Sequence, residues 1–193
     1  GGSSDALGTP MTTEQLTRLL DGLREGENGV KHGLSEKINF EVALLKAVEA
    51  VNNRQKTTLF TKLARHFGGA DKLAGKTIAL WGLAFKPNTD AMREAPSREL
   101  IADLFAAGAT VTAYDPVAMH ETQRIYGDDS RIQYAESPMG ALDKADALLI
   151  VTEWKEFRSP DFDAIKASLK NPVIFDGRNL YDPKFVRASG IEY

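Results

Sequence analysis

Residues 76–97, KTIALWGLAFKPNTDAMREAPS, constrain the fold more than any other part of the chain. The run Lys76–Leu83 is short, apolar and rich in β-branched and aromatic residues, which is typical of a strand buried on both faces of a parallel sheet. A polar loop follows, and Pro96 then begins an amphipathic helix, where a proline in the first turn removes no needed hydrogen bond. This order predicts that the loop lies at the carboxyl edge of a parallel sheet, where ligands bind.

The alternation of strands and helices continues to the end of the chain. Further strands are expected at 110–114, 132–134, 145–152, 173–175 and, as an edge piece, 191–193. Helices are expected at 97–107, 118–126, 139–144 and 162–168. Repeated βα units predict a parallel sheet covered on both faces. The fold class is therefore α/β, a Rossmann-like doubly wound parallel sheet with an N-terminal helical extension.

The amino-terminal part of the chain predicts two helices. Thr12 and Gln15 form a capping-box pattern before a leucine stripe, so a short helix is expected from Thr13 to about Arg24. The first four residues, GGSS, are interpreted as a cloning linker. A second helix, from about 38 to 67, contains no proline or glycine, and at about 1.5 Å per residue it is longer than a small domain is wide. Such a helix usually buries its apolar stripe against another chain or domain.

Composition excludes several classes of function. A net charge of −3 argues against nucleic acid as a partner, and the absence of cysteine excludes disulfides and thiol chemistry within these 193 residues. The three histidines are scattered and lack the spacing of metal ligands. There is no apolar run of roughly 20 residues and no signal-peptide pattern, so no membrane association is expected and the cytoplasm is the default location.

Three motifs resemble one known family. They are GLAFKPNTDAMREAPS at 82–97, YDP at 114–116 and DGRNLYDP at 176–183. These motifs are similar to the carboxyl-terminal UDP-binding domain of the UDP-glucose/GDP-mannose dehydrogenase family, in particular its UDP-glucose 6-dehydrogenases. LLKAVEAVNNRQK at 44–56 resembles the helix that precedes this domain. The resemblance divides the chain into an unmatched helical segment (1–39), a connecting and dimerisation helix (40–70) and a UDP-sugar-binding domain (71–193).

The resemblance implies two successive oxidations that convert UDP-glucose to UDP-glucuronate with NAD. It implies that Phe85, Lys86 and Arg178 hold the UDP-sugar, and that Arg93 reaches NAD held by another domain. It also implies a homodimer formed through the helix Phe40–Phe67. No catalytic residue and no metal ligand is expected, because this sequence has neither the nucleophilic cysteine nor the NAD-binding domain of the family. The chain alone is therefore expected to be inactive.

The residue types fit these roles, although each also has a purely structural interpretation. Phe85 beside Lys86 offers a stacking face and a cation, which suit a base and its phosphate. Arg178 follows an Asp-Gly turn, where glycine permits a tight turn, and its guanidinium can fork onto phosphate or sugar oxygens. Alternatively, Lys86 is a surface lysine, and Arg178 pairs with Asp176 or Asp182 as scaffolding.

Two further functions compete with UDP-sugar binding. One is a structural module whose helices dimerise and whose crevice is empty. The other is an independent NAD-binding domain, in which Asp115, at the end of a strand, binds an adenosine ribose. The loop after the first strand lacks G-x-G-x-x-G, which disfavours this second alternative. The chain also has Asp90-Ala91 where the family has two acidic residues after the threonine, which leaves the contacts of Asp90 undecided.

Overall fold

The computed structural model describes residues 12–27 and 34–193, and it divides the chain into two compact units, up to Gln55 and from Lys56 to Tyr193. The first unit contains α1 (Thr13–Glu27) and the beginning of α2 (Leu34–His66). The capping box is confirmed, because Thr12 Oγ1 accepts from Gln15 N at 3.1 Å and Gln15 Oε1 accepts from Thr12 N at 3.0 Å. Both helices differ from the sequence prediction only at their ends.

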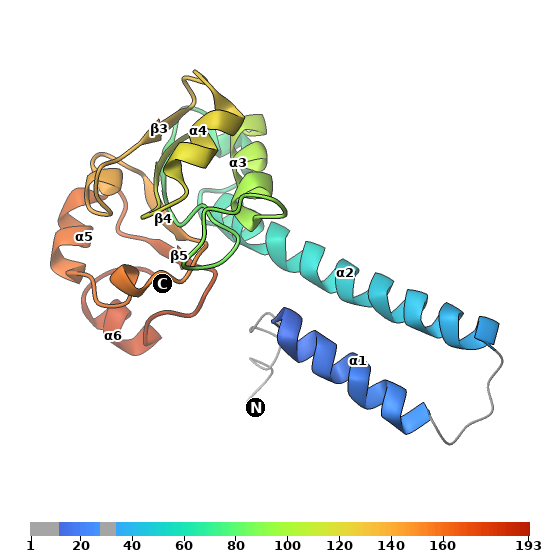
Figure 1. Cartoon of the computed structure of the whole chain (residues 1–193). Helices are drawn as coiled ribbons and strands as arrows, with labels where there is room; N and C mark the ends of the chain where they lie inside the picture. Colours follow the sequence, from blue (N-terminus) through green and yellow to red (C-terminus); the bar gives the residue numbers. More distant parts are fainter. Residues whose placement is uncertain (1–11, 28–33) are drawn as a thin grey trace. The chain divides into compact units, whose positions relative to one another are not determined.

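The second unit is a five-stranded parallel sheet surrounded by short helices (Figure 1). Its strands are β1 (Thr77–Trp81), β2 (Thr110–Tyr114), β3 (Ile132–Tyr134), β4 (Ala147–Ile150) and β5 (Ile174–Asp176). Its α-helices after α2 are α3 (Pro96–Ala106), α4 (Met119–Tyr126), α5 (Phe162–Ser168) and α6 (Pro183–Ala188). The strand order β3-β2-β1-β4-β5 and the parallel pairing confirm the predicted α/β class.

Three short 3₁₀ segments complete the second unit: η1 (Ala70–Leu73), η2 (Gly140–Leu142) and η3 (Lys155–Phe157). The helix predicted at 139–144 is wrong in kind, because only η2 forms there and the backbone leaves the helical conformation at Asp143 (φ −58°, ψ 116°). The expected edge piece at 191–193 is a single parallel bridge between Val173 and Glu192. Helix α6 was not predicted, although Asp182 caps it and Pro183 occupies its first turn.

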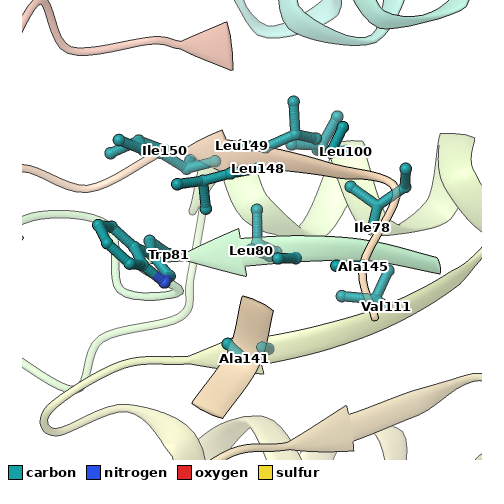
Figure 2. Packing of buried hydrophobic residues seen from close by; sticks show 14 of the residues in the cluster. Ile78, Leu80, Trp81, Leu100, Val111, Ala141, Ala145, Leu148, Leu149 and Ile150 are labelled. Carbon is teal, nitrogen blue, oxygen red and sulfur yellow. The ribbon is translucent and has the colours of Figure 1, made fainter. Parts of the chain in front are cut away.

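The central strands are buried on both faces, as their apolar sequences require. Leu80 pairs with Leu149, and both lie on the same side of the sheet as Leu100 of α3 (Figure 2). Trp81 points to the opposite side, where its ring stacks on Phe157 with 5.0 Å between the centroids. The indole Nε1 of Trp81 also donates to Pro138 O at 2.8 Å, so this large side chain has no unsatisfied polar atom. The sheet therefore separates two packed layers.

The burial of the apolar side chains of α2 changes along its length. Leu63 and Ala64 are buried, and Leu59, Phe60 and the following Phe67 pack against the core of the second unit. Before Lys56, five of its large apolar side chains are exposed by 43–56%, namely Ile38, Phe40, Val42, Leu45 and Val51, whereas Leu44 and Val48 are half-buried. Hence only the carboxyl-terminal turns of α2 belong to the domain core.

Gly82, directly after β1, is required by both conformation and space. Its φ is +92°, and a Cβ atom there would lie 2.5 Å from Thr152 Cβ and 2.6 Å from Thr152 N. Gly75 has a similar φ of +77° but no atom within 4 Å of the same position. The two glycines therefore separate the cost of backbone strain from the cost of steric overlap.

We predict that Gly82→Ala lowers the free energy of unfolding by about 2–5 kcal/mol, because strain and overpacking add. Gly75→Ala is the matched control and should cost only about 1–2 kcal/mol, from strain alone. Urea unfolding followed by circular dichroism measures both values. Equal losses in the two variants would show that the close approach of Gly82 to Thr152 does not constrain this position.

Candidate functional site

The candidate site lies at the carboxyl edge of the sheet. The chain proceeds from β1 to β2 and β3 on one side of β1, and then returns to place β4 and β5 on its other side. The direction of winding thus reverses between β1 and β4, which is where open α/β sheets bind ligands. Four of the loops that begin at this edge form the candidate site: 82–95 after β1, 115–118 after β2, 151–154 after β4 and 177–182 after β5.

A buried carboxylate joins three of these loops. Asp115, which is fully buried, accepts five hydrogen bonds from neutral N–H groups. Its Oδ2 accepts from Leu83 N at 2.7 Å, Ala84 N at 3.1 Å and Trp154 Nε1 at 3.0 Å. Its Oδ1 accepts from the backbone N of residues 117 and 118 at 2.9 and 2.7 Å. The loops after β1, β2 and β4 therefore share one acceptor group.

This arrangement overturns the alternative in which Asp115 binds an adenosine ribose. Such a residue needs an accessible carboxylate oxygen, whereas both oxygens of Asp115 are buried and already accept hydrogen bonds from the protein. Its role is to hold the loops together. The position at the end of β2 suggested a ligand contact only because the sequence does not show which backbone N–H groups converge on it.

Two buried hydroxyl groups fix the start of the β1 loop. Ser97 Oγ donates to Leu83 O at 2.6 Å, and Thr152 Oγ1 donates to Ala84 O at 2.7 Å. The backbone N–H and C=O of Leu83 and Ala84 are therefore bonded just before Phe85. The loop thus starts from a rigid base at the reversal point of the sheet.

Phe85 and Lys86 follow this base directly and are exposed. Phe85 retains 39% of its side-chain exposure, and its N–H donates to Ala91 O at 2.8 Å, which closes the loop. Lys86 is exposed, and within the described part of the chain its amino group has no hydrogen bond or ion pair. An aromatic face and a lysine cation are therefore presented side by side at the carboxyl edge.

Arg178 is held more firmly, by the loop after β4. Its Nε donates to Val151 O at 2.8 Å and lies 2.9 Å from Oε2 of Glu153, and its side chain is 23% exposed. Its backbone N–H donates to Asp176 Oδ1 at 2.8 Å. The sequence-based alternative, in which Arg178 pairs with an acidic residue as scaffolding, was therefore correct about the pairing but wrong about the partner. The side chain pairs with Glu153 and not with Asp176 or Asp182.

Gly177 corrects a second expectation. Its backbone is not in the left-handed region, so the turn does not need glycine for its conformation. A Cβ atom there would instead lie 2.8 Å from Leu59 Cδ1 and 3.1 Å from Ile150 O. Glycine is required because α2 packs against the start of the Arg178 loop.

Arg93 lies on the far limb of the β1 loop, between the buried Met92 and Ala95, and its own side chain is exposed. The sequence-predicted residues are thus connected through shared loops: Thr152 links the β4 loop to the start of the Phe85–Lys86 segment, and Val151 links it to Arg178. No hydrogen bond or ion pair among the described residues joins Lys86, Arg93 and Arg178 to each other.

Two acidic residues of this edge were missed as site residues by the sequence reasoning. Glu153 contacts Arg178, and Asp176 accepts from the backbone N of Arg178 and Leu180 and from Tyr193 Oη. Their signal was available, because each is a polar residue at the carboxyl end of a buried strand.

Tyr114 and Tyr193, each hydrogen-bonded to a carboxylate, have raised pKa values. Partial burial, together with the charge of Glu156 and a hydrogen bond to it, raises the pKa of Tyr114 to about 12. Burial, followed by the hydrogen bond to Asp176, also raises the pKa of Tyr193 well above its ordinary value. Both phenols are therefore neutral donors at physiological pH.

The described residues contain no group of three or more acidic or histidine side chains placed to hold a metal ion. A separate open groove of about 520 Å³ lies between the segments 158–163 and 180–189, with Phe162, Tyr181 and Phe185 in its lining. It contains none of Phe85, Lys86, Arg93 and Arg178. No helix among residues 12–27 and 34–193 is long and apolar enough to cross a membrane.

Comparison with known families tests the resemblance that the sequence motifs indicated. Residues 79–183, more than half of the chain, match the UDP-binding domain of the UDP-glucose/GDP-mannose dehydrogenase family. The chain belongs to this family. The matched residues include all four loops of the candidate site, so the UDP-binding domain is the part of the family that carries it.

Individual relatives agree with this assignment. A UDP-glucose 6-dehydrogenase of Pseudomonas aeruginosa is 45% identical over 162 residues, which cover 82% of this chain and 35% of the relative. One of Bacillus subtilis is 38% identical over 160 residues, covering 83% and 35%. The structure of a UDP-glucose dehydrogenase from Pyrobaculum islandicum superposes with a TM-score of 0.65 at 30% identity, over 92% of this chain and 36% of that one. The chain therefore spans about a third of the length of these relatives.

We predict that Asp115→Asn lowers the free energy of unfolding by about 3 kcal/mol or more. Whichever oxygen becomes an amide NH₂ group, at least two buried N–H donors lose their acceptor, and each costs about 1–3 kcal/mol. Asp90→Asn, an exposed residue of the β1 loop, is the matched control and should change stability by less than about 0.5 kcal/mol. Thermal and urea unfolding measure both variants. A neutral Asp115→Asn variant would contradict this role.

Proposed function

We propose that this chain is the UDP-sugar-binding portion of a UDP-glucose 6-dehydrogenase, an oxidoreductase that converts UDP-glucose to UDP-glucuronate with two NAD. The observation that carries the proposal is that the match to the UDP-binding domain includes Phe85, Lys86 and Arg178, all at the carboxyl edge of the sheet. The relatives named above as UDP-glucose 6-dehydrogenases support the same substrate.

In this proposal Phe85 and Lys86 bind the nucleotide end of the ligand. The exposed Phe85 ring provides a stacking face for the base, and the Lys86 ammonium group neutralises the diphosphate. Because Leu83 and Ala84 are fixed by Asp115, Ser97 and Thr152, the loop tip offers these groups from a preorganised base. Preorganisation lowers the entropy lost when the ligand binds.

Arg178 completes the site from the β5 side. Its Nε is occupied by Val151 O and Glu153, and neither Nη atom has a hydrogen bond to a described residue. A planar pair of N–H donors suits phosphate or sugar oxygens. We assign Arg178 to the sugar diphosphate and expect it to orient the ligand, without a part in proton or hydride transfer.

NAD enters the proposal as the cofactor of the whole enzyme. This chain lacks the glycine fingerprint after β1, and its buried Asp115 is not free for a ribose, so its residues do not form a dinucleotide site of their own. We propose that the exposed Arg93 contacts NAD held elsewhere in the enzyme. The 193 residues contain no cysteine to act as the nucleophile, so we propose that this chain alone is inactive.

A second candidate function is dimerisation through α2. The observation that favours it is the set of apolar side chains on α2 that are exposed by 43–56% before Lys56. Large apolar side chains that are exposed on a helix are often part of a protein interface. We therefore propose residues 40–70 as a connecting and dimerisation helix between residues 1–39, which carry none of the family motifs, and the domain 71–193, with the cytoplasm as its location.

We predict that the chain binds UDP-glucose weakly and that Lys86→Ala and Arg178→Ala each reduce the affinity about ten- to a hundredfold. Each variant removes a charge-assisted contact, typically worth about 1.5–3 kcal/mol. Arg93→Ala should retain the affinity, because its proposed partner is NAD. Isothermal titration calorimetry with UDP-glucose measures each variant, and raised salt should weaken binding by screening.

Lys72→Ala, an exposed lysine of η1 outside the carboxyl-edge loops, is the control for loss of a positive charge. It should bind as the unmodified chain does. Equal losses in Lys86→Ala, Arg93→Ala and Lys72→Ala would indicate a general charge effect and would contradict the assigned site. No binding by the unmodified chain at millimolar UDP-glucose would overturn the proposed function.

We predict a homodimer of the 21.1 kDa chain that Val48→Asp with Val51→Asp dissociates, because an unpaired charge buried in an interface is costly. Ala43→Asp with Ala50→Asp adds the same charge at two exposed positions elsewhere around α2 and is the matched control. Light scattering at tens of micromolar (about the range where standard-size interfaces are stable) reports the mass. A monomeric unmodified chain would refute this candidate function.

A further inference from the structure

Residues 152–154, in the loop after β4, contact both ligand-binding loops of the proposed site. Thr152 Oγ1 donates to Ala84 O at 2.7 Å, and Trp154 Nε1 donates to Asp115 Oδ2 at 3.0 Å. Both of these residues are buried, and Trp154 N also donates to Thr152 O at 3.0 Å. Glu153 stands between them, so its side chain extends from a backbone position that is fixed on both sides.

The carboxylate of Glu153 meets Arg178 in an unusual way. Oε2 lies 2.9 Å from Nε of Arg178, yet Nε donates its hydrogen bond to Val151 O at 2.8 Å. Glu153 Oε2 is buried and accepts no hydrogen bond from any described residue. The contact is therefore an attraction between opposite charges without an aligned hydrogen bond.

A buried carboxylate oxygen without a donor is unfavourable unless a charge compensates it. The guanidinium of Arg178 provides that charge, and in return its own position is restricted. Its backbone is fixed by Asp176, and its Nε is fixed by Val151 and Glu153. The hydrogen-bonding capacity that remains is at the two Nη groups, which have no hydrogen bond to a described residue.

We propose that Glu153 is a positioning residue, which holds the guanidinium of Arg178 so that its Nη groups are ready for the diphosphate or sugar oxygens of the ligand. The identity of the ligand rests on the proposed function, whereas the Glu153–Arg178 contact does not. An arginine that is already ordered loses less side-chain entropy when it binds. Glu153 therefore strengthens binding although it does not touch the ligand.

Simple electrostatics predicts the opposite sign. Glu153 is an anion beside a site for an anionic ligand, so removal of its charge should make UDP-glucose bind more tightly if charge alone matters. Under the positioning role, Glu153→Gln keeps the size of the side chain but releases Arg178, and UDP-glucose binds more weakly. The direction of the change therefore separates the two explanations.

The first measurement is calorimetric titration of UDP-glucose into the full chain, Glu153→Gln and Glu156→Gln. We expect about three- to tenfold weaker binding for Glu153→Gln, the scale of ordering one long side chain. Glu156→Gln makes the same charge change three residues later, at an exposed carboxylate that accepts from Tyr114 Oη, and it should bind as well as or slightly more tightly than the full chain. Binding by Glu153→Gln that is unchanged or tighter overturns the proposal.

The second measurement needs no ligand. The side-chain Nε–H signal of Arg178 in a ¹⁵N–¹H correlation spectrum is assigned by its loss in Arg178→Lys. It should be sharp in the full chain and in Glu156→Gln, and broadened by exchange in Glu153→Gln. An unchanged signal in Glu153→Gln overturns the proposal whatever the affinity does. If the full chain does not bind UDP-glucose at all, the proposed function fails, and this signal alone decides whether Glu153 positions Arg178.

Discussion

The buried carboxylate of Asp115 is the interaction on which the carboxyl edge of the sheet depends. Its charge is stabilised by hydrogen bonds from five neutral N–H donors, which belong to the loops after β1, β2 and β4. A charge removed from water is tolerated only when such partners are in place together. The three loops therefore cannot adopt independent conformations, and the same group that stabilises the fold also sets the geometry of the candidate site.

This dependence explains the contrast between the base and the tip of the β1 loop. Leu83 and Ala84 are fully buried and bonded, whereas Phe85, the next residue, is 39% exposed. A rigid base with an exposed tip is the arrangement expected of a binding loop on a stable scaffold. On the β5 side, Arg178 is held through Val151 and Glu153 of the same β4 loop. The short β4 loop thus holds both sides of the site in position.

The sequence predicted those features that depend on local patterns. The apolar runs located all five strands, and the Thr12–Gln15 capping box was confirmed. Two errors are local, the helix expected at 139–144 and the missed α6. The other errors concern contacts between residues far apart in the chain. Asp115 allowed a disfavoured alternative as a ribose-binding acid, Gly177 was expected to permit a tight turn, and Glu153 was given no partner. The long-range partners of these residues lie between 25 positions (Glu153 to Arg178) and 118 positions (Gly177 to Leu59) away. Parallel strands need long crossover connections, so no local pattern contains these partners.

Gly177 shows how far this coupling extends. A methyl group there would lie 2.8 Å from Leu59 Cδ1 on α2, and Gly177 N donates to Ile150 O at 2.9 Å. The carboxyl-terminal turns of α2 thus pack directly against the loop that carries Arg178. Leu63, one turn further on, is fully buried in the same core. A close-packed interior resists any rearrangement of its side chains. The position of the loop is therefore coupled to the packing of α2. The placement of Arg178 depends on this packing as well as on Glu153.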